Sequence, residues 1–214
     1  MNQTTPQVSL LWATPNPINV VVLAAKQTVM RIPEVGKNKN ALIEFLYKAD
    51  HRSTFEHVCM CLHITGVSRA FMSQITRHRL ASFTCSSQHY QNYSEYPIVS
   101  QQYTKQMTQS IEEAMRVYEA SLDAGIAKDQ ARMVLPEAMT VNMVMTANAR
   151  EWAEILHQRL CHRNTLETQQ VAKLIYAQCL DWFVELFKFV GPQCYEGVCK
   201  QGRLGCTEPY YAAG

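Results

Sequence analysis

The chemically most informative segment runs from residue 76 to residue 94. It opens with Arg77-His-Arg79, continues through serine, threonine and glutamine side chains, and ends near His89 and Tyr90. Guanidinium groups keep their charge and match phosphate oxygens, and the hydroxyls and N–H groups of a serine-rich turn also suit anions. These residue types predict a nucleotide-like ligand. A basic helix end followed by a solvated polar loop would explain the same residues without a ligand.

Arg150 and Arg159 are further candidates for anion contacts, on a helix predicted to begin after the cap residue Asn148. Nine residues at about 100° each place the two guanidinium groups on opposite sides of that helix. Within one subunit they therefore do not grip the same phosphate. Either one of them is a surface charge or the two serve different sites.

The elements that must position these residues alternate between strands and helices. Periodicity and turn residues predict strands at 8–12, 18–25 and 55–65, and helices at 41–49, 67–77, 101–125, 129–135 and 165–190. Segment 139–145 fits either a strand or a buried helix. Asn148 and Asn164 each precede a glutamate by three residues, which is the spacing of a capping box.

Four potential zinc ligands lie on one face of the strand predicted at 55–65. They are His57, Cys59, Cys61 and His63. Side chains on one face of a strand repeat about every 6.8 Å, so the outer two are roughly 20 Å apart. One metal ion cannot reach all four at bonding distance. We expect a half-buried sheet face here and no metal site.

Composition limits the classes of protein that this chain can represent. It has 214 residues, 47% of them hydrophobic, and a formal net charge of +2. That length suffices for one sizeable core, and so small a charge gives no indication of nucleic-acid binding. The apolar run from Val20 to Ala25 is too short to span a bilayer or to serve as a signal peptide. We expect a cytoplasmic protein with no membrane or nucleic-acid partner.

The chain shows neither internal repeats nor a linker, and no glycine-rich phosphate loop. A single catalytic domain is expected over residues 1–190, followed by a cysteine-containing tail over residues 191–214. Without an export signal, the eight cysteines are expected to be mostly reduced thiols. Cys194, Cys199 and Cys206 in the tail are open to two interpretations: a redox or metal clip, or a loosely packed chain end.

The spacing of Arg77-His-Arg79 and Ser87, with seven residues between Arg79 and Ser87, resembles the signature of the flavin-dependent thymidylate synthase family. Further matches run in order from about residue 40 to about residue 190 of the printed sequence. They are His51 with Ser53-Thr-Phe-Glu-His57, Gln74, Arg132 with Leu135-Pro136, Asn148-Ala-Arg150, Arg159, and Glu167 with Gln169.

This resemblance implies a fold and a reaction. The implied fold is α+β, a small mixed or antiparallel sheet flanked by long helices, assembled as a homotetramer with active sites where subunits meet. The implied reaction is reductive methylation of dUMP to dTMP. Methylenetetrahydrofolate would supply the carbon, NADPH would reduce FAD, and the flavin would supply the hydride. The chain itself would contribute positioning and electrostatics.

The resemblance also implies roles for individual residues. Cofactor binding would fall to His51, Ser53, Glu56, Arg77, His78, Arg79, Asn148 and Arg150. Substrate binding would fall to Gln74, Cys85, Ser86, Ser87, His89, Arg132 and Arg159. Ser87, Arg159 and His51 would be the catalytic residues. For Ser87, a hydrogen bond to the nucleotide fits better than nucleophilic attack, because no His or Asp is placed in the sequence to activate it.

Three residues depart from the family pattern. Cys85 stands where the family has Glu, His89 where it has Arg, and Glu154 where it has Asn. The first two changes leave open another pyrimidine nucleotide such as dCMP, or a hydroxymethyl product. The third leaves open a non-catalytic nucleotide- or flavin-binding protein. Cys85 is either a reactive thiolate with a pKa lowered by nearby cations or a small residue that fills space.

Overall fold

The computed structural model describes residues 2–28, 38–197, 199 and 201–206. The described chain divides into two compact units. Unit 1 consists of Met1–Gln7, His63–Arg77 and Phe83–Val144, and unit 2 of Val8–Leu62, His78–Ser82 and Met145–Gly214. Residues 198, 200 and 207–214 of the predicted tail lie outside the described residues.

A four-stranded sheet has the strand order β2-β3-β6-β4. Its strands are β2 (Gln7–Ala13), β3 (Cys59–Ser68), β6 (Thr140–Asn148) and β4 (Ser82–Cys85). All four strands belong to both units, because the boundary falls within each of them. Segment 139–145, which fitted either type of element, is strand: from Val141 to Ala147 every second side chain of β6 is buried.

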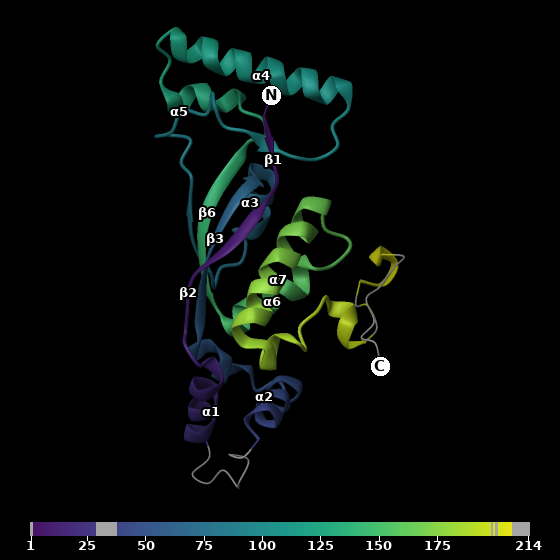
Figure 1. Ribbon diagram of the computed structural model, residues 1–214. Coiled ribbons are helices and arrows are strands. Elements are labelled where there is room, and N and C mark those ends of the chain that lie inside the picture. Colours follow the sequence, from purple (N-terminus) through teal and green to yellow (C-terminus); the bar gives the residue numbers. More distant parts are fainter. Residues whose placement is uncertain (1, 29–37, 198, 200, 207–214) are drawn as a thin grey trace. The chain divides into compact units, whose positions relative to one another are not determined.

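Unit 2 contains most of the helices (Figure 1). They are α1 (Pro17–Thr28), α2 (Lys39–Lys48), η2 (Arg52–His57), α6 (Ala149–Arg159), α7 (Leu166–Phe187), η4 (Gln193–Glu196) and η5 (Gly202–Leu204). Trp152 and Phe183 are fully buried in this unit. The Trp152 indole N–H donates to the Met60 carbonyl at 3.2 Å, which ties α6 to β3. The core of unit 2 therefore sets the position of α6.

Unit 1 has its own hydrophobic core. Its elements are β1 (Gln3–Thr4), α3 (Arg69–Ile75), β5 (Ile98–Val99), α4 (Lys105–Asp123), α5 (Lys128–Ala131) and η3 (Arg132–Val134). Strand β1 pairs with β5 in parallel. Tyr93, Ile98 and Tyr118 lie fully buried at the centre of this core. The Tyr93 backbone N–H donates to the Tyr118 hydroxyl at 3.2 Å, which fixes the loop after residue 86 against α4.

The predicted strand at 18–25 is wrong, because this segment belongs to helix α1. Pro17 is the first helical residue, where its fixed φ angle and missing N–H suit a helix start. The buried residues Val21, Val22 and Ala25 recur at helical spacing. The β-branched run that suggested a strand thus forms the apolar stripe of a helix.

The cap predicted at Asn148 is confirmed, whereas that predicted at Asn164 is displaced by one residue. Asn148 Oδ1 accepts the Glu151 N–H at 2.9 Å at the start of α6. At the start of α7 the cap is Thr165, whose hydroxyl accepts a backbone N–H at 3.2 Å. The Asn164 side chain instead donates to carbonyls at the end of α6, at 2.7 Å for Gln158. Asn164 therefore satisfies orphan carbonyls of the preceding helix.

The mixed α+β class is confirmed. Of the predicted ladder, Cys59, Cys61 and His63 lie on β3, with Cys59 and His63 half-buried and Cys61 buried. The predicted strand start at residue 55 is wrong, because His57 ends the η2 turn and β3 begins at Cys59. Within the described residues, no group of three or more His, Cys, Asp or Glu side chains could hold a metal ion. In that same part of the chain, no helix is long and apolar enough to cross a bilayer.

Candidate active site

The predicted site residues form two groups, because they belong to different units. Unit 2 holds His51, Ser53, Glu56, His78, Arg79, Asn148, Arg150 and Arg159. Unit 1 holds Gln74, Arg77, Cys85, Ser86, Ser87, His89 and Arg132. Most of the residues predicted for the cofactor thus lie in unit 2, and most of those predicted for the nucleotide lie in unit 1.

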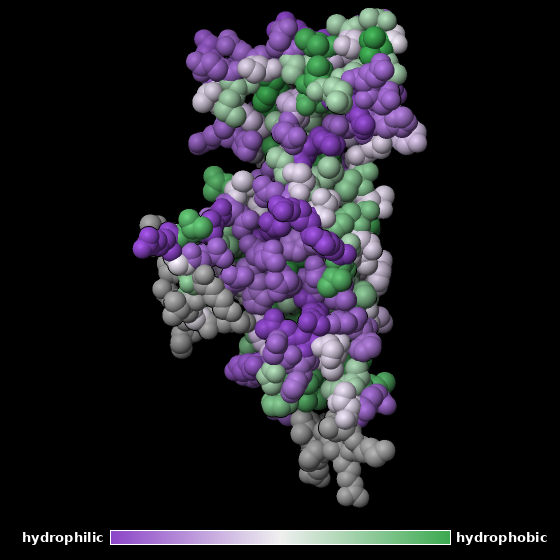
Figure 2. Space-filling view, turned by 180° about the vertical axis from the view of Figure 1, so that it is seen from behind, coloured by the Kyte–Doolittle hydropathy of each residue, from purple (hydrophilic) through white to green (hydrophobic). Residues whose placement is uncertain are grey.

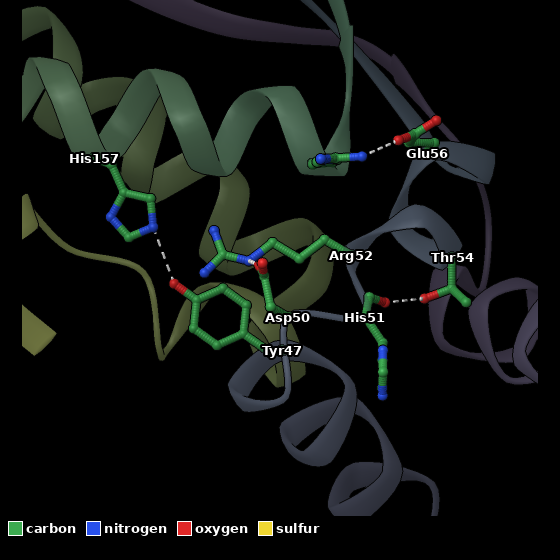
Figure 3. Close-up of polar contacts among 8 residues, drawn as sticks. Tyr47, Asp50, His51, Arg52, Thr54, Glu56 and His157 are labelled. Atoms are coloured by element: carbon green, nitrogen blue, oxygen red, sulfur yellow. Dashed lines mark hydrogen bonds and ion pairs between the residues drawn. The ribbon is translucent and has the colours of Figure 1, made fainter.

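The η2 turn carries the first predicted cofactor residues (Figure 3). Its Thr54 is buried, and the Thr54 hydroxyl donates to the carbonyl of His51 at 3.3 Å. The side chains of His51, Ser53 and Glu56 are exposed. The buried Thr54 therefore anchors a turn whose polar side chains lie at the surface.

The first turn of α6 places a guanidinium beside this turn. Arg150 Nη1 lies 2.5 Å from Glu56 Oε1, and Figure 3 shows the Glu56 end of the pair. The two side chains are 51% and 45% exposed. An exposed pair of this kind contributes at most about 1 kcal/mol to stability. Such a pair opens at little cost when an anionic ligand competes for the guanidinium.

The far end of α6 holds a buried polar cluster. His78 is only 6% exposed, and its Nε2 accepts a hydrogen bond from Arg159 Nε at 3.1 Å. His78 Nδ1 lies 3.4 Å from Glu151 Oε1. Burial and the neighbouring Arg159 lower the pKa of His78 to about 4, against a smaller opposing effect of Glu154. Burial raises the pKa of the Glu151 carboxyl.

The two arginines of α6 engage different partners, as their spacing predicted. Arg150 pairs with Glu56, whereas Arg159 pairs with His78 and is half-buried. Glu154 lies between them in the sequence, is exposed, and accepts a hydrogen bond from a neighbouring glutamine at 3.0 Å. The helix therefore offers two separate guanidinium groups.

The flanking residues of the signature behave differently from its histidine. Arg77 and Arg79 are exposed, whereas His78 between them is buried. The loop around Arg77-His-Arg79 thus turns two fixed cations to the surface and one imidazole inward. The outward pair retains the charge that suits phosphate oxygens.

In unit 1, the segment after β4 forms a polar loop anchored on β6. The Ser86 hydroxyl donates to the Asn142 carbonyl and accepts its N–H, both at 3.1 Å. The Ser87 hydroxyl accepts the backbone N–H of His89 at 3.2 Å. Ser87 is half-buried and His89 is exposed. Ser86 therefore holds the loop in place, while Ser87 and His89 line it.

Of the two interpretations of Cys85, the thiolate with a lowered pKa is contradicted. Burial raises the pKa of the Cys85 thiol, and the opposing effect of Arg69 is smaller. The thiolate is the nucleophilic form of cysteine. Burial therefore opposes the deprotonation that would activate the Cys85 thiol.

Gln88 is a candidate that the sequence did not single out. Its side chain is 6% exposed, and its Nε2 is buried without a hydrogen-bond partner among the described residues. Leaving a buried amide N–H unsatisfied costs about 1–3 kcal/mol, so such an atom suggests a polar ligand. A glutamine in a serine-rich loop gives no sequence signal for burial, because glutamine is usually exposed.

The remaining two nucleotide candidates of unit 1 lie on short helices. Gln74 belongs to α3 and is half-buried. Arg132 begins η3, is half-buried, and donates from Nε to the carbonyl of Asp129 at 3.2 Å. That bond orients the guanidinium plane of Arg132.

A cavity of about 370 Å³ lies in unit 2 beside the end of α6. Arg159 is among its lining residues, together with four cysteines: Cys161, Cys194, Cys199 and Cys206. Cys194 is buried, and the tail near it forms the short turns η4 and η5. The described part of the tail therefore packs against the turn between α6 and α7.

Comparisons with known proteins match most of this chain. It is 31% identical to the flavin-dependent thymidylate synthase of Geobacter sulfurreducens, over 94% of this chain and 93% of the relative. The corresponding protein of Nitratidesulfovibrio vulgaris is 30% identical, with 96% of each chain covered. That of Pyrococcus abyssi is 31% identical over 73% of this chain and 72% of the relative. A family model described as "Thymidylate synthase complementing protein" matches residues 9–183.

The chain belongs to the flavin-dependent thymidylate synthase family. The resemblance drawn from the signature residues is thereby confirmed. The matched range 9–183 contains every predicted site residue from His51 to Arg159. It excludes Cys194, Cys199 and Cys206, so the cysteines of the tail stand apart from the family match.

Proposed function

We propose that this member of the flavin-dependent thymidylate synthase family catalyses the reductive methylation of dUMP to dTMP. Methylenetetrahydrofolate supplies the carbon and NADPH is the reductant. FAD is the cofactor, and the working form is a homotetramer. The names of the matching relatives support the activity. The structural observation that carries the proposal is that Arg77, Arg79 and Arg150 expose their guanidinium groups at the signature positions.

The donor set of unit 2 fits the phosphates of a dinucleotide cofactor. Arg79 and Arg150 are exposed cations, and Ser53 and His51 add a hydroxyl and an imidazole. Forked guanidinium donors match phosphate oxygens bidentately. Arg150 becomes available when its surface pair with Glu56 opens. These residues would hold FAD, which supplies hydride transfer when bound.

The loop of unit 1 fits the nucleotide. Ser87 and His89 offer a hydroxyl and an imidazole at its surface, and Gln88 offers a buried amide N–H that the described protein leaves unsatisfied. Ser86 anchors the loop to β6 at 3.1 Å. Hydrogen bonds from such a site reject a base with the wrong donor pattern, because its own polar groups would then be left unpaired.

In this mechanism the chain stabilises charge and orients the substrate. C5 of the pyrimidine must act as a nucleophile, and the enolate-like form of the ring that does so carries negative charge on a carbonyl oxygen. A half-buried guanidinium such as that of Arg159 stabilises this charge more strongly than one in water. Arg132, oriented by its bond to the carbonyl of Asp129, would hold the phosphate. Ser87 would donate or accept a hydrogen bond rather than attack the ring.

The exposed apolar residues of β2 support self-association. This strand lies at one edge of the sheet and exposes Leu10, Leu11 and Trp12 by 47%, 53% and 50%. An apolar edge strand is a ready surface for pairing with another chain. Figure 2 shows that one face of the molecule is largely hydrophilic, with hydrophobic side chains scattered over it. Light scattering should give four times the chain mass of 24.4 kDa, and a monomer would contradict this part of the proposal.

The activity is tested with dUMP tritiated at C5. Purified protein is supplied with FAD, NADPH and methylenetetrahydrofolate, and both released tritium and dTMP are measured. We expect release from dUMP and none from tritiated dCMP. Arg159→Ala should abolish release, whereas Arg116→Ala, at an exposed site on α4, should not. Release from dCMP alone, or none from dUMP while NADPH still bleaches the flavin, would contradict the proposal.

A further inference from the structure

The histidine of the signature has both of its ring nitrogens directed at protein groups. Arg159 Nε donates to His78 Nε2 at 3.1 Å, and Glu151 Oε1 lies 3.4 Å from His78 Nδ1. The imidazole itself is 6% exposed. A ring enclosed in this way has little surface left for a ligand. His78 therefore acts in the site through the residues that it contacts, Arg159 and Glu151.

The direction of the bond to Arg159 fixes the protonation of the ring. A guanidinium is always protonated and can only donate, so His78 Nε2 must carry a lone pair. The single proton of the neutral ring then lies on Nδ1, on the side of Glu151. A charged imidazolium would turn an N–H toward Arg159 and repel it. Burial and Arg159 lower the pKa of His78 to about 4, so the accepting form persists at neutral pH.

The bond also restricts Arg159. Its side chain is long and half-buried, and an arginine side chain has about 2 kcal/mol of rotamer entropy. By accepting the hydrogen bond from Nε, His78 restricts the plane of the Arg159 guanidinium. A guanidinium oriented before the ligand arrives loses less entropy on binding.

We infer that His78 is a positioning residue, which holds the guanidinium of Arg159 in the orientation that binds the nucleotide, and that Glu151 fixes the imidazole in turn. This inference rests on the proposed function and refines it, because it separates His78 from the cofactor contacts of Arg77 and Arg79. The signature then has two tasks. Its exposed cations, Arg77 and Arg79, contact a ligand, and its buried imidazole orients the guanidinium of Arg159 on α6.

Two substitutions at His78 separate its two nitrogens. His78→Gln retains an acceptor near the place of Nε2, whereas His78→Asn retains only a polar group near Nδ1 and removes the acceptor for Arg159. We expect His78→Asn to weaken dUMP binding about tenfold, with flavin content unchanged. His78→Gln should keep affinity within about threefold of wild type. His63→Asn, at a half-buried histidine of β3 outside the site, is the matched control and should change neither quantity.

A double-mutant cycle assigns the effect to Arg159. In an Arg159→Ala background, His78→Asn should weaken dUMP binding no further, because the group that it positions is absent. Loss of flavin with unchanged dUMP affinity in His78→Asn would overturn the inference, and so would an additive effect in the cycle. If Arg159→Ala itself leaves dUMP affinity unchanged, the proposed role of Arg159 fails instead. A protein that binds neither FAD nor dUMP would refute the proposed function as a whole.

One measurement needs no substitution. In protein labelled with ¹⁵N-histidine, the nitrogen shifts of His78 report which ring nitrogen carries the proton. We expect a neutral ring protonated at Nδ1 from pH 7 down to about pH 5. Protonation at Nε2 would overturn the inference even if the variants failed to fold, because Arg159 would then have no acceptor there.

Discussion

Gly66 in β3 offers a test of how tightly unit 1 is packed. Its φ angle is +67°, in the left-handed region that side chains other than glycine rarely adopt. A Cβ added there would lie 2.8 Å from the backbone oxygen of Thr5 and 3.2 Å from Thr4 Cγ2. The backbone on both sides of this contact is held by hydrogen bonds, so neither segment moves away easily. The Gly66 N–H donates to Asn142 Oδ1 at 3.1 Å, and the Thr4 carbonyl accepts from Ser100 at 2.7 Å.

Gly66→Ala should therefore be destabilising for two separate reasons. The left-handed backbone conformation costs about 1–2 kcal/mol for a residue with a Cβ. Overpacking a tight contact adds about 1–3 kcal/mol. The free energy of unfolding should fall by roughly 2–5 kcal/mol in total. Far-UV circular dichroism during urea unfolding measures this loss.

Gly125→Ala is the matched control. Gly125 has a φ angle of +81°, but nothing lies within 4 Å of the position that its Cβ would take. It should therefore incur only the backbone cost, about 1–2 kcal/mol. The difference between the two variants isolates the contact with Thr5. If Gly66→Ala destabilises the protein no more than Gly125→Ala does, the packing argument is refuted.

Three further predictions concern buried or half-buried polar groups. Tyr47→Phe removes the buried hydrogen bond between the Tyr47 hydroxyl and His157 Nε2 (3.1 Å, Figure 3) and should lower the free energy of unfolding by about 1 kcal/mol in urea titrations; unchanged stability would contradict it. Because the pKa of His78 falls from 6.5 to about 4 on folding, the unfolded chain binds the extra proton between those values. The free energy of unfolding should therefore decrease as pH falls through that window, and His78→Gln, measured alongside at pH 7 and pH 5, should flatten the decrease. Arg132→Ala should weaken dUMP binding roughly 10- to 100-fold by calorimetry, as expected for a charge-assisted bond; equal affinity would show that Arg132 is not the phosphate contact.

Local sequence signals predicted much of the fold, because the chain follows them closely where they are strong. Strand β3 and the cap at Asn148 are both present in the structure. The segment at 18–25 failed because β-branched residues favour strands in isolation, whereas Pro17 starts a helix and tertiary packing buries the helical stripe. Asn164 failed because two neighbouring residues both suit a cap, and only the contacts decide which one serves.

The candidate site was predictable to the extent that it depends on residue types. Motif spacing singled out Arg150 and Arg159 and placed them on opposite sides of a helix, and they do engage different partners. Burial was not readable from the sequence. Nothing in the motif indicates that His78 turns inward, that Gln88 is enclosed, or that enclosure raises the pKa of Cys85. Those properties depend on contacts between segments far apart in the chain.

The cavity beside Arg159 gives the protein natural attachment points for a reporter. Cys199 and Cys206 line that cavity and are half-buried, so a maleimide dye reaches them more readily than the fully enclosed Cys179. A dye bound there would sense the electric field of the arginine next to it. Ligand capture by Arg159 could then be followed as a change in fluorescence, without engineering a new cysteine into the chain.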